Sequence, residues 1–201
     1  IFAFNQLALQ GALLEMICHG LSTPALFIVV GVLQDRLHTR DMDRMGGLWT
    51  TVPRLGGVAM FFAIASLGLP GLGNFIGEFF VLVGTFRVNV PAAVLGSIGL
   101  VGAAIYSLWI VQRAFHGGPR EVWDLPDLNL RGMLVFAPMI VVLVWLGVYP
   151  QPVLATASSA LQGVRNAVTG TTQYDPFNHR AATSADDPAR SDTLAVEDGG
   201  R

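Results

Sequence analysis

The chain has 201 residues, of which 52% are hydrophobic and only 13% are charged, and its formal net charge is -2. Its mean hydropathy is +0.54. Soluble domains carry about twice this share of charged residues, so the composition is typical of an integral membrane protein. The near-neutral charge and the lack of a basic patch argue against a nucleic-acid partner. A single cysteine, Cys18, excludes a disulfide within the chain.

Four apolar segments lie between charged borders, and each is long enough to cross a bilayer. They run from about residue 5 to 33, 55 to 86, 90 to 111 and 132 to 149. The turn after Phe86 is short, which predicts that the second and third segments are antiparallel neighbours. We therefore predict an all-α fold, a polytopic transmembrane helix bundle of about four spans in residues 1–150. Residues 34–54 read as a polar loop with room for a short surface helix.

Both ends of the chain differ from this bundle in character. Hydrophobicity fades after Pro150, and from Thr169 the sequence is rich in Thr, Ala, Asp and Gly. Residues 151–201 are therefore expected to form a polar C-terminal tail that is largely disordered. The chain begins at Ile1 inside an apolar run, without an initiator methionine or a signal peptide. We interpret it as the C-terminal part of a longer chain.

The distribution of arginine predicts the orientation in the membrane, since all twelve cationic residues are arginine. Seven of them fall in residues 34–54 and 112–131: Arg36, Arg40, Arg44, Arg54, Arg113, Arg120 and Arg131. Short loops rich in Lys or Arg lie on the cytoplasmic side. Both of these loops are therefore predicted to be cytoplasmic, and the Arg87 turn and the C-terminal tail to face the opposite side.

The second apolar segment contains the stretch LGLPGLGNFIGEFF, residues 67–80. Pro70 has no backbone donor, and the glycines Gly68, Gly71 and Gly73 tolerate backbone angles that other residues resist. The pattern predicts that the helix is interrupted there. Such an interruption at membrane depth requires protein or water to satisfy the freed backbone groups, so it marks a candidate site.

Glu78 is the only charged residue between Leu55 and Phe86. An ionisable group within a membrane segment usually faces the interior of the bundle and takes part in transport or pairing. Beside an interrupted helix it is a candidate proton-transfer group. The structural alternative is a static partner for an arginine or a satisfied buried carboxylate.

A second polar group lies on the first segment. Glu15, His19 and Ser22 are spaced i, i+4 and i+7, which predicts one polar stripe on a helix, with Thr23 beside it. His19 could both accept and donate a proton in a relay, because the pKa of histidine lies near physiological pH. The simpler interpretation is a hydrogen-bonded packing histidine that pairs with Glu15. The four histidines are scattered and there is one cysteine, so no metal site is expected.

Five motifs in this order carry a family resemblance: HGLSTPALFIVVG, HTRDMDRMGGLW, ASLGLPGLGNFIGEFFVLVG, YSLWIVQRAFHG and LGVYPQP. Residues 1–155 resemble the C-terminal part of the antiporter-like subunit M family of bacterial respiratory complex I. Its mitochondrial counterpart is NADH dehydrogenase subunit 4. The resemblance implies a fourteen-helix subunit built from two inverted five-helix repeats, of which this chain holds helices eleven to fourteen, with helix twelve interrupted.

The resemblance also assigns roles to residues of this chain. It implies that Glu78 is the terminal proton-transfer residue and that His19 belongs to the central polar axis. Glu15 has no assigned counterpart, and its part in proton transfer is a separate hypothesis. The buried lysines of the family would lie upstream of Ile1, since this chain contains no lysine.

The implied function is that of a proton-translocating membrane subunit of NADH:quinone oxidoreductase in the bacterial inner membrane. No cofactor is expected on this chain, because NADH, FMN, the iron–sulfur clusters and quinone would bind other subunits. The expected partners are the other membrane subunits of complex I, including sister antiporter-like subunits, and the lipid bilayer. The alternatives are a subunit of a multi-subunit Na⁺/H⁺ antiporter or of a membrane-bound hydrogenase, or a segment that only anchors its neighbours.

Overall fold

The computed structural model describes residues 3, 5–118, 121 and 123–170, and helices are the only regular elements in this part of the chain. The chain divides into two compact units, Ile1–Arg165 and Asn166–Arg201. The site lies in the first unit. Its helices are α1 (Gln6–Leu37), α2 (Leu48–Thr51), α3 (Pro53–Ala65), α4 (Gly73–Phe86), α5 (Val90–Phe115), α6 (Leu130–Val148) and most of α7 (Gln151–Thr169).

Three helices begin at an asparagine, for the same chemical reason. The side chains of Asn5, Asn89 and Asn129 accept hydrogen bonds from backbone N–H groups in the first turns of α1, α5 and α6. These N–H groups have no partner within their own helix. Each asparagine therefore fixes the residue at which its helix begins.

The predicted fold class is confirmed. In the described residues, α1, α5 and α6 are each long and apolar enough to cross a membrane. They correspond to the first, third and fourth predicted segments, although α1 continues to Leu37, beyond the predicted limit at residue 33. The residue that caps its C-terminal end is His38, whose φ of 52° places it in the left-handed region.

The second predicted segment is interrupted, as its glycines and proline indicate. It is divided between α3, with 13 residues, and α4, with 14 residues. Between them, Gly68 and Gly71 have φ values of 64° and 99°. These positive angles strain any residue with a Cβ atom.

One glycine of this stretch has a different role from the one that the sequence predicts. Gly73 is the first residue of α4 and does not lie in the interruption. A Cβ atom on Gly73 would overlap the sulfur of Cys18 and lie 3.0 Å from the Cβ of Leu146. Glycine is needed here because α1 and α6 pack closely against the start of α4.

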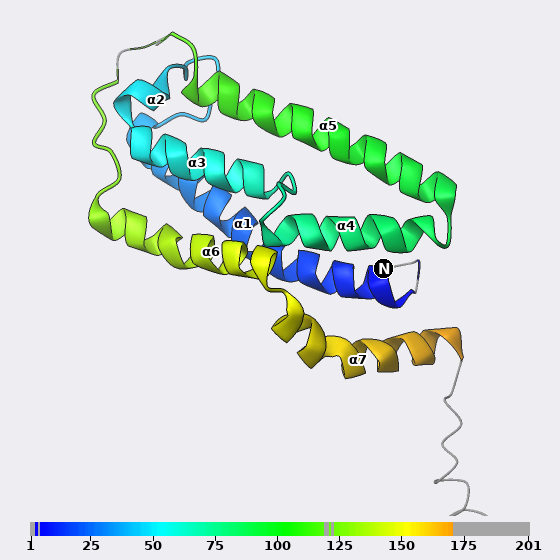
Figure 1. The fold of residues 1–201 in the computed structure, drawn as a ribbon. Helices are drawn as coiled ribbons and strands as arrows, with labels where there is room; N and C mark the ends of the chain where they lie inside the picture. The colour runs from blue at the N-terminus through cyan, green and yellow to red at the C-terminus, as the bar shows by residue number, and fades with distance from the viewer. Residues whose placement is uncertain (1–2, 4, 119–120, 122, 171–201) are drawn as a thin grey trace, which may run out of the picture. The chain divides into compact units, whose positions relative to one another are not determined.

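Helix α1 runs alongside both halves of the interrupted helix, and α5 returns antiparallel to them (Figure 1). Glycines allow α1 and α4 to approach closely. A Cβ atom on Gly11 would lie 2.7 Å from the carbonyl oxygen of Gly77, and one on Gly84 would lie 2.6 Å from the backbone nitrogen of Ala8. Small residues permit such contacts between membrane helices, where van der Waals packing drives association.

The expectation of a disordered tail is wrong for its first part, because α7 spans Gln151–Thr169. Pro152 is compatible with a first helical turn, and Val153, Ala157 and Leu161 recur at every fourth position with partly buried side chains. Fading hydrophobicity therefore marks an amphipathic helix rather than the end of ordered structure. Residues 171–201 of the predicted tail lie outside the described residues, and the domain division at residue 150 stays a prediction.

The two arginine-rich loops bind each other. The guanidinium of Arg44 donates hydrogen bonds of 2.9 and 3.1 Å to Glu121, and this contact holds the pKa of Glu121 below its usual value. Arg113 pairs with Asp43, and Arg36 donates to the carbonyl oxygen of Pro126. Residues 34–54 and the described part of residues 112–131 therefore lie at the same end of the helices.

Candidate functional site

Glu78 lies in α4, one to two turns after the interruption, and its side chain is half-buried. Its Oε2 atom is buried and has no hydrogen-bond partner among the described residues. A Cβ atom on Gly68 would overlap this carboxyl group. The carboxyl group therefore lies directly against the backbone of the interruption, where only glycine leaves room for it.

Glu15 of α1 faces the same part of α4. Its Oε1 atom accepts a long hydrogen bond of 3.5 Å from the side-chain amide of Asn74. Its own backbone nitrogen would lie 2.9 Å from a Cβ atom on Gly77, the residue next to Glu78. The Oε2 atom of Glu15 would lie 2.8 Å from the same Cβ atom, so the Glu15 carboxyl group packs against the residue that precedes Glu78. The tertiary structure thus brings together two acidic residues that are 63 positions apart in the sequence.

Asn74 is a member of this site that the sequence analysis missed. It is 1% exposed, and its Oδ1 atom is buried without a hydrogen-bond partner in the described part of the chain. The available signal was its spacing, since Asn74 and Glu78 are i and i+4 on one helix and therefore share a face. The second oxygen of Glu15 is buried and unpartnered in the same way.

The residues of the polar stripe predicted on α1 do not share one environment, because the neighbouring helices cover some of them and leave others exposed. Ser22 is fully buried, Glu15 is partly buried against α4, and His19 is exposed. The hydroxyl of Thr23 lies 3.1 Å from Nε2 of His19, within hydrogen-bond distance. In this structure His19 does not pair with Glu15, and it lies outside the group formed by Glu15, Asn74 and Glu78.

No cation compensates the two carboxyl groups within the described residues. Neither carboxyl group takes part in the ion pairs of Arg44 with Glu121 and of Arg113 with Asp43, which lie at the loop end of the helices. Nor does the described part of the chain contain a group of three His, Cys, Asp or Glu side chains that could hold a metal ion. The geometry therefore gives Glu78 no salt-bridge partner within the described residues.

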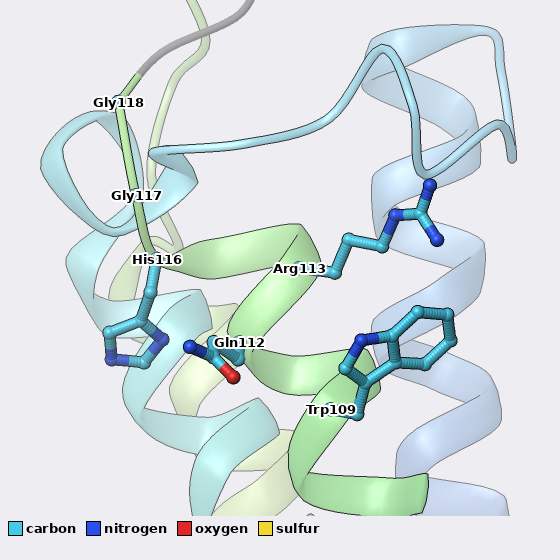
Figure 2. A pocket seen from close by; sticks show the side chains of 6 residues that line it. All are labelled: Trp109, Gln112, Arg113, His116, Gly117 and Gly118. Atoms are coloured by element: carbon cyan, nitrogen blue, oxygen red, sulfur yellow. The ribbon is translucent and has the colours of Figure 1, made fainter.

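A separate pocket of about 400 Å³ lies at the loop end of α5 (Figure 2). Its lining residues are Trp109, Gln112, Arg113, His116, Gly117 and Gly118. The guanidinium of Arg113 lies 5.0 Å from the centre of the Trp109 ring, a cation–π contact. None of the sequence-predicted site residues lines this pocket, so it is distinct from the carboxyl group pair.

Residues 1–105 match the family described as "NADH:quinone oxidoreductase/Mrp antiporter, TM". The chain belongs to this family. The match includes α1 to α4, and hence the interruption, Glu15, Asn74 and Glu78. Because the chain belongs to this family and has apolar helices long enough to cross a membrane, it is a membrane protein.

Curated relatives in this family carry the name of one subunit. The chain is 48% identical to NADH-quinone oxidoreductase subunit M of Pseudomonas aeruginosa, over 82% of this chain and 32% of that protein. It is 45% identical to the same subunit of Escherichia coli strain K12, over 85% and 35%. It is 42% identical to NADH-ubiquinone oxidoreductase chain 4 of Marchantia polymorpha, over 75% and 31%.

A solved structure, respiratory complex I from Thermus thermophilus with bound NADH, contains a similar chain. The similarity has a TM-score of 0.70 and 28% sequence identity, over 80% of this chain and 35% of the other. The chain thus spans about a third of the length of the relatives that it matches. The expected resemblance to subunit M of complex I is confirmed.

Proposed function

We propose that this chain is the C-terminal part of a membrane subunit that translocates protons in an NADH:quinone oxidoreductase. The observation that supports this most strongly is the Glu78 carboxyl group, half-buried beside an interrupted helix and without a cation partner among the described residues. Ionisable groups in such places commonly belong to proton relays. The subunit M relatives make the assignment to complex I specific.

In this proposal Glu78 is the terminal proton-transfer residue. A buried carboxyl oxygen without a protein donor needs a proton or a water molecule as its partner. The interruption beside Gly68 frees backbone groups that water can also satisfy. Water that enters there would carry the proton released by Glu78 to the side of the Arg87 turn.

His19 would deliver protons from the upstream part of the subunit. It is exposed in this chain, which accounts for about a third of the length of its relatives, so its surface is available to the rest of the subunit. Its neutral ring can accept a proton at one nitrogen and donate from the other. Glu15 is the third candidate, since it contacts the same helix face as Glu78.

The chain would not itself carry out the redox chemistry. NADH, FMN, the iron–sulfur clusters and quinone would bind other subunits, and this chain would contact the other membrane subunits, including sister antiporter-like subunits. In this proposal loops 34–54 and 112–131 would lie in the cytoplasm and the tail, residues 151–201, on the periplasmic side of a bacterial inner membrane, which the arginine distribution favours. The mutual binding of the two loops supports placing both on one side.

A second candidate follows from the family description, which also covers Mrp antiporters. A Na⁺/H⁺ antiporter subunit, or a subunit of a membrane-bound hydrogenase, could use the same interrupted helix. The names of the relatives favour complex I. The genes beside the full-length gene would distinguish the candidates.

The deciding experiment replaces Glu78 with Gln in the full-length subunit within the assembled complex. Glutamine has the same shape but cannot exchange a proton, so proton pumping and coupled NADH oxidation are expected to fall roughly tenfold or more. Glu78→Asp should retain part of the activity. Normal pumping by an assembled Glu78→Gln complex would overturn the proposal, and pumping that survives loss of both Glu78 and His19 would favour a purely anchoring role.

A further inference from the structure

Three buried oxygen atoms near the start of α4 have no hydrogen-bond donor in the described residues. They are Oε2 of Glu15, Oδ1 of Asn74 and Oε2 of Glu78. The atoms belong to one continuous group, since Asn74 donates to Glu15 and stands one helical turn before Glu78. All three are acceptors. Such a group is stable only if it also holds a hydrogen that can be donated.

The charged groups on the surrounding elements do not supply this hydrogen. On α1, the nearest ionisable neighbours of Glu15 are the buried thiol of Cys18 and the exposed ring of His19. The thiol points to Gly73, and the His19 ring lies beside Thr23. Neither side chain forms a hydrogen bond with a carboxyl group of the pair, and a thiol is only a weak donor.

The other helices carry their arginines far from the pair. On α4, Arg87 follows the last residue, about 14 Å along the helix axis from Glu78. On α3 the only charged residue, Arg54, lies in the first turn and binds Leu128. Arg113 lies in the last turn of α5 and Arg131 in the first turn of α6. None of these four arginines is placed to neutralise the two carboxyl groups.

Two negative charges in one poorly solvated place, without a cation, are strongly unfavourable, because each carboxylate loses hydration and repels the other. A single proton relieves both problems, since it removes one charge and provides the missing donor. We infer that Glu15 and Glu78 bind one proton between them, with Asn74 holding Glu15 in its charged form and Glu78 carrying the proton.

The position of the proton follows from the hydrogen bond of Asn74. An amide N–H group donates more strongly to a charged carboxylate than to a neutral acid. Because Asn74 donates to Glu15, this residue is the better place for the negative charge. Glu78 has no such donor in the described structure, so the proton resides on it. Glu15 is then a positioning residue, which acts on proton transfer through Glu78.

This inference rests on the proposed function and explains how Glu78 stays protonated until it releases its proton. Release leaves two charges, which persist only until the next proton arrives. Repulsion between the two carboxylates therefore favours rapid reprotonation of Glu78. Sequence spacing could not suggest this, since the pairing depends on how α1 and α4 pack.

Infrared spectroscopy of the assembled complex, which holds the full-length subunit, tests the shared proton directly. A protonated carboxyl group gives a C=O stretching band that disappears as it ionises. At neutral pH we expect such a band in the wild type and its loss in Glu78→Gln, whereas in Glu15→Gln the band should remain only at more acidic pH. Glu15→Gln removes the neighbouring charge, so the midpoint of the band should move to lower pH by about one unit or more.

Matched variants distinguish the effect of the Glu15 charge from the effect of its side-chain shape. Glu15→Asp retains the charge and should keep the midpoint near that of the wild type, whereas Met16→Gln alters the adjacent exposed position and should leave it unchanged. If Glu15→Gln does not assemble, Glu15→Met is also uncharged and of similar length. An unchanged midpoint in the uncharged variants, or a band that survives Glu78→Gln, would overturn the inference.

Pumping assays on the same preparations separate this inference from the proposed function. If Glu78→Gln stops pumping but the uncharged Glu15 variants leave the midpoint unchanged, only the shared proton is refuted. If Glu78→Gln pumps normally while the band shifts as expected, the shared proton stands and the proposed function fails.

Discussion

The side chain of Asp127 caps helix α3, which begins 74 residues before it at Pro53: its Oδ2 atom accepts a hydrogen bond of 2.9 Å from the backbone N–H of Arg54. Its Oδ1 atom accepts a second bond, of 3.2 Å, from the N–H of Leu55. Val52, the residue before α3, makes no side-chain cap. The loop before α6 therefore fixes the start of the helix that leads to the interruption.

Replacement of Asp127 with Ala should destabilise the protein by about 1 kcal/mol, the usual effect of losing a helix N-cap. Thermal unfolding of the purified full-length subunit in detergent would measure it. Asp124→Ala, at an exposed aspartate of the same loop, should have little effect. Equal losses in the two variants would show that the cap does not stabilise α3.

The stabilisation by Asp127 should disappear in acid. Partial burial raises the pKa of Asp127, but hydrogen bonds from the backbone of Arg54, Leu128 and Leu55 outweigh it and lower the pKa below its ordinary value. A group with a lowered folded-state pKa stabilises the fold above its unfolded pKa, about 3.9, and loses this effect as the pH falls through the folded value. The stability difference between wild type and Asp127→Asn should therefore be full at pH 6 and shrink below about pH 4.

The link between the two loops can be tested by titration of Glu121. The hydrogen bond from Arg44 is the main reason why the pKa of Glu121 is lowered. In Arg44→Gln the pKa of Glu121 should rise toward its ordinary value, as followed by NMR of labelled glutamate. Arg40→Gln serves as a control, because Arg40 donates to Gln34 instead. An unchanged pKa in Arg44→Gln would show that the pair does not form in solution.

Replacement of Gly84 with Val should separate α1 from α4. A Cβ atom on Gly84 would already lie 2.6 Å from the backbone of Ala8. Overpacking of this kind typically costs about 1–3 kcal/mol. Gly31 of α1 has no atom within 4 Å of its Cβ position, so Gly31→Ala should be neutral or slightly stabilising in a helix. Thermal unfolding compares the two, and a neutral Gly84→Val would contradict the close packing.

The role of Gly68 can be separated from backbone strain by a pair of variants. Gly68→Ala and Gly71→Ala both introduce a Cβ atom at a positive φ, which strains the backbone. Only the Cβ on Gly68 would overlap Glu78, whereas the one on Gly71 meets no atom within 4 Å. Proton pumping by the assembled complex should therefore fall more in Gly68→Ala, by several-fold relative to Gly71→Ala. Similar losses would mean that strain, rather than the position of Glu78, limits pumping.

Several features were predictable from local residue chemistry. Apolar segments between charged borders predicted α1, α5 and α6, because a helix that crosses a bilayer must be long and uncharged. Gly68 and Pro70 predicted the interruption, since their backbone properties do not depend on distant residues. Glu78 stood out because it is the only charge in its segment. The amphipathic helix α7 is not predicted, because hydrophobicity fades along the segment that forms it.

The sequence by itself therefore determined the membrane class, the helical fold, the interruption and the candidate carboxyl group, all of which follow from the composition and spacing of neighbouring residues. Only the tertiary structure decided which of the polar residues meet. It brings Glu15 and Asn74 to Glu78, leaves His19 on the surface and places Asp127 at the start of α3. These contacts depend on how glycines let α1 and α4 approach and on how two loops pair, and neither has a local signature in the chain.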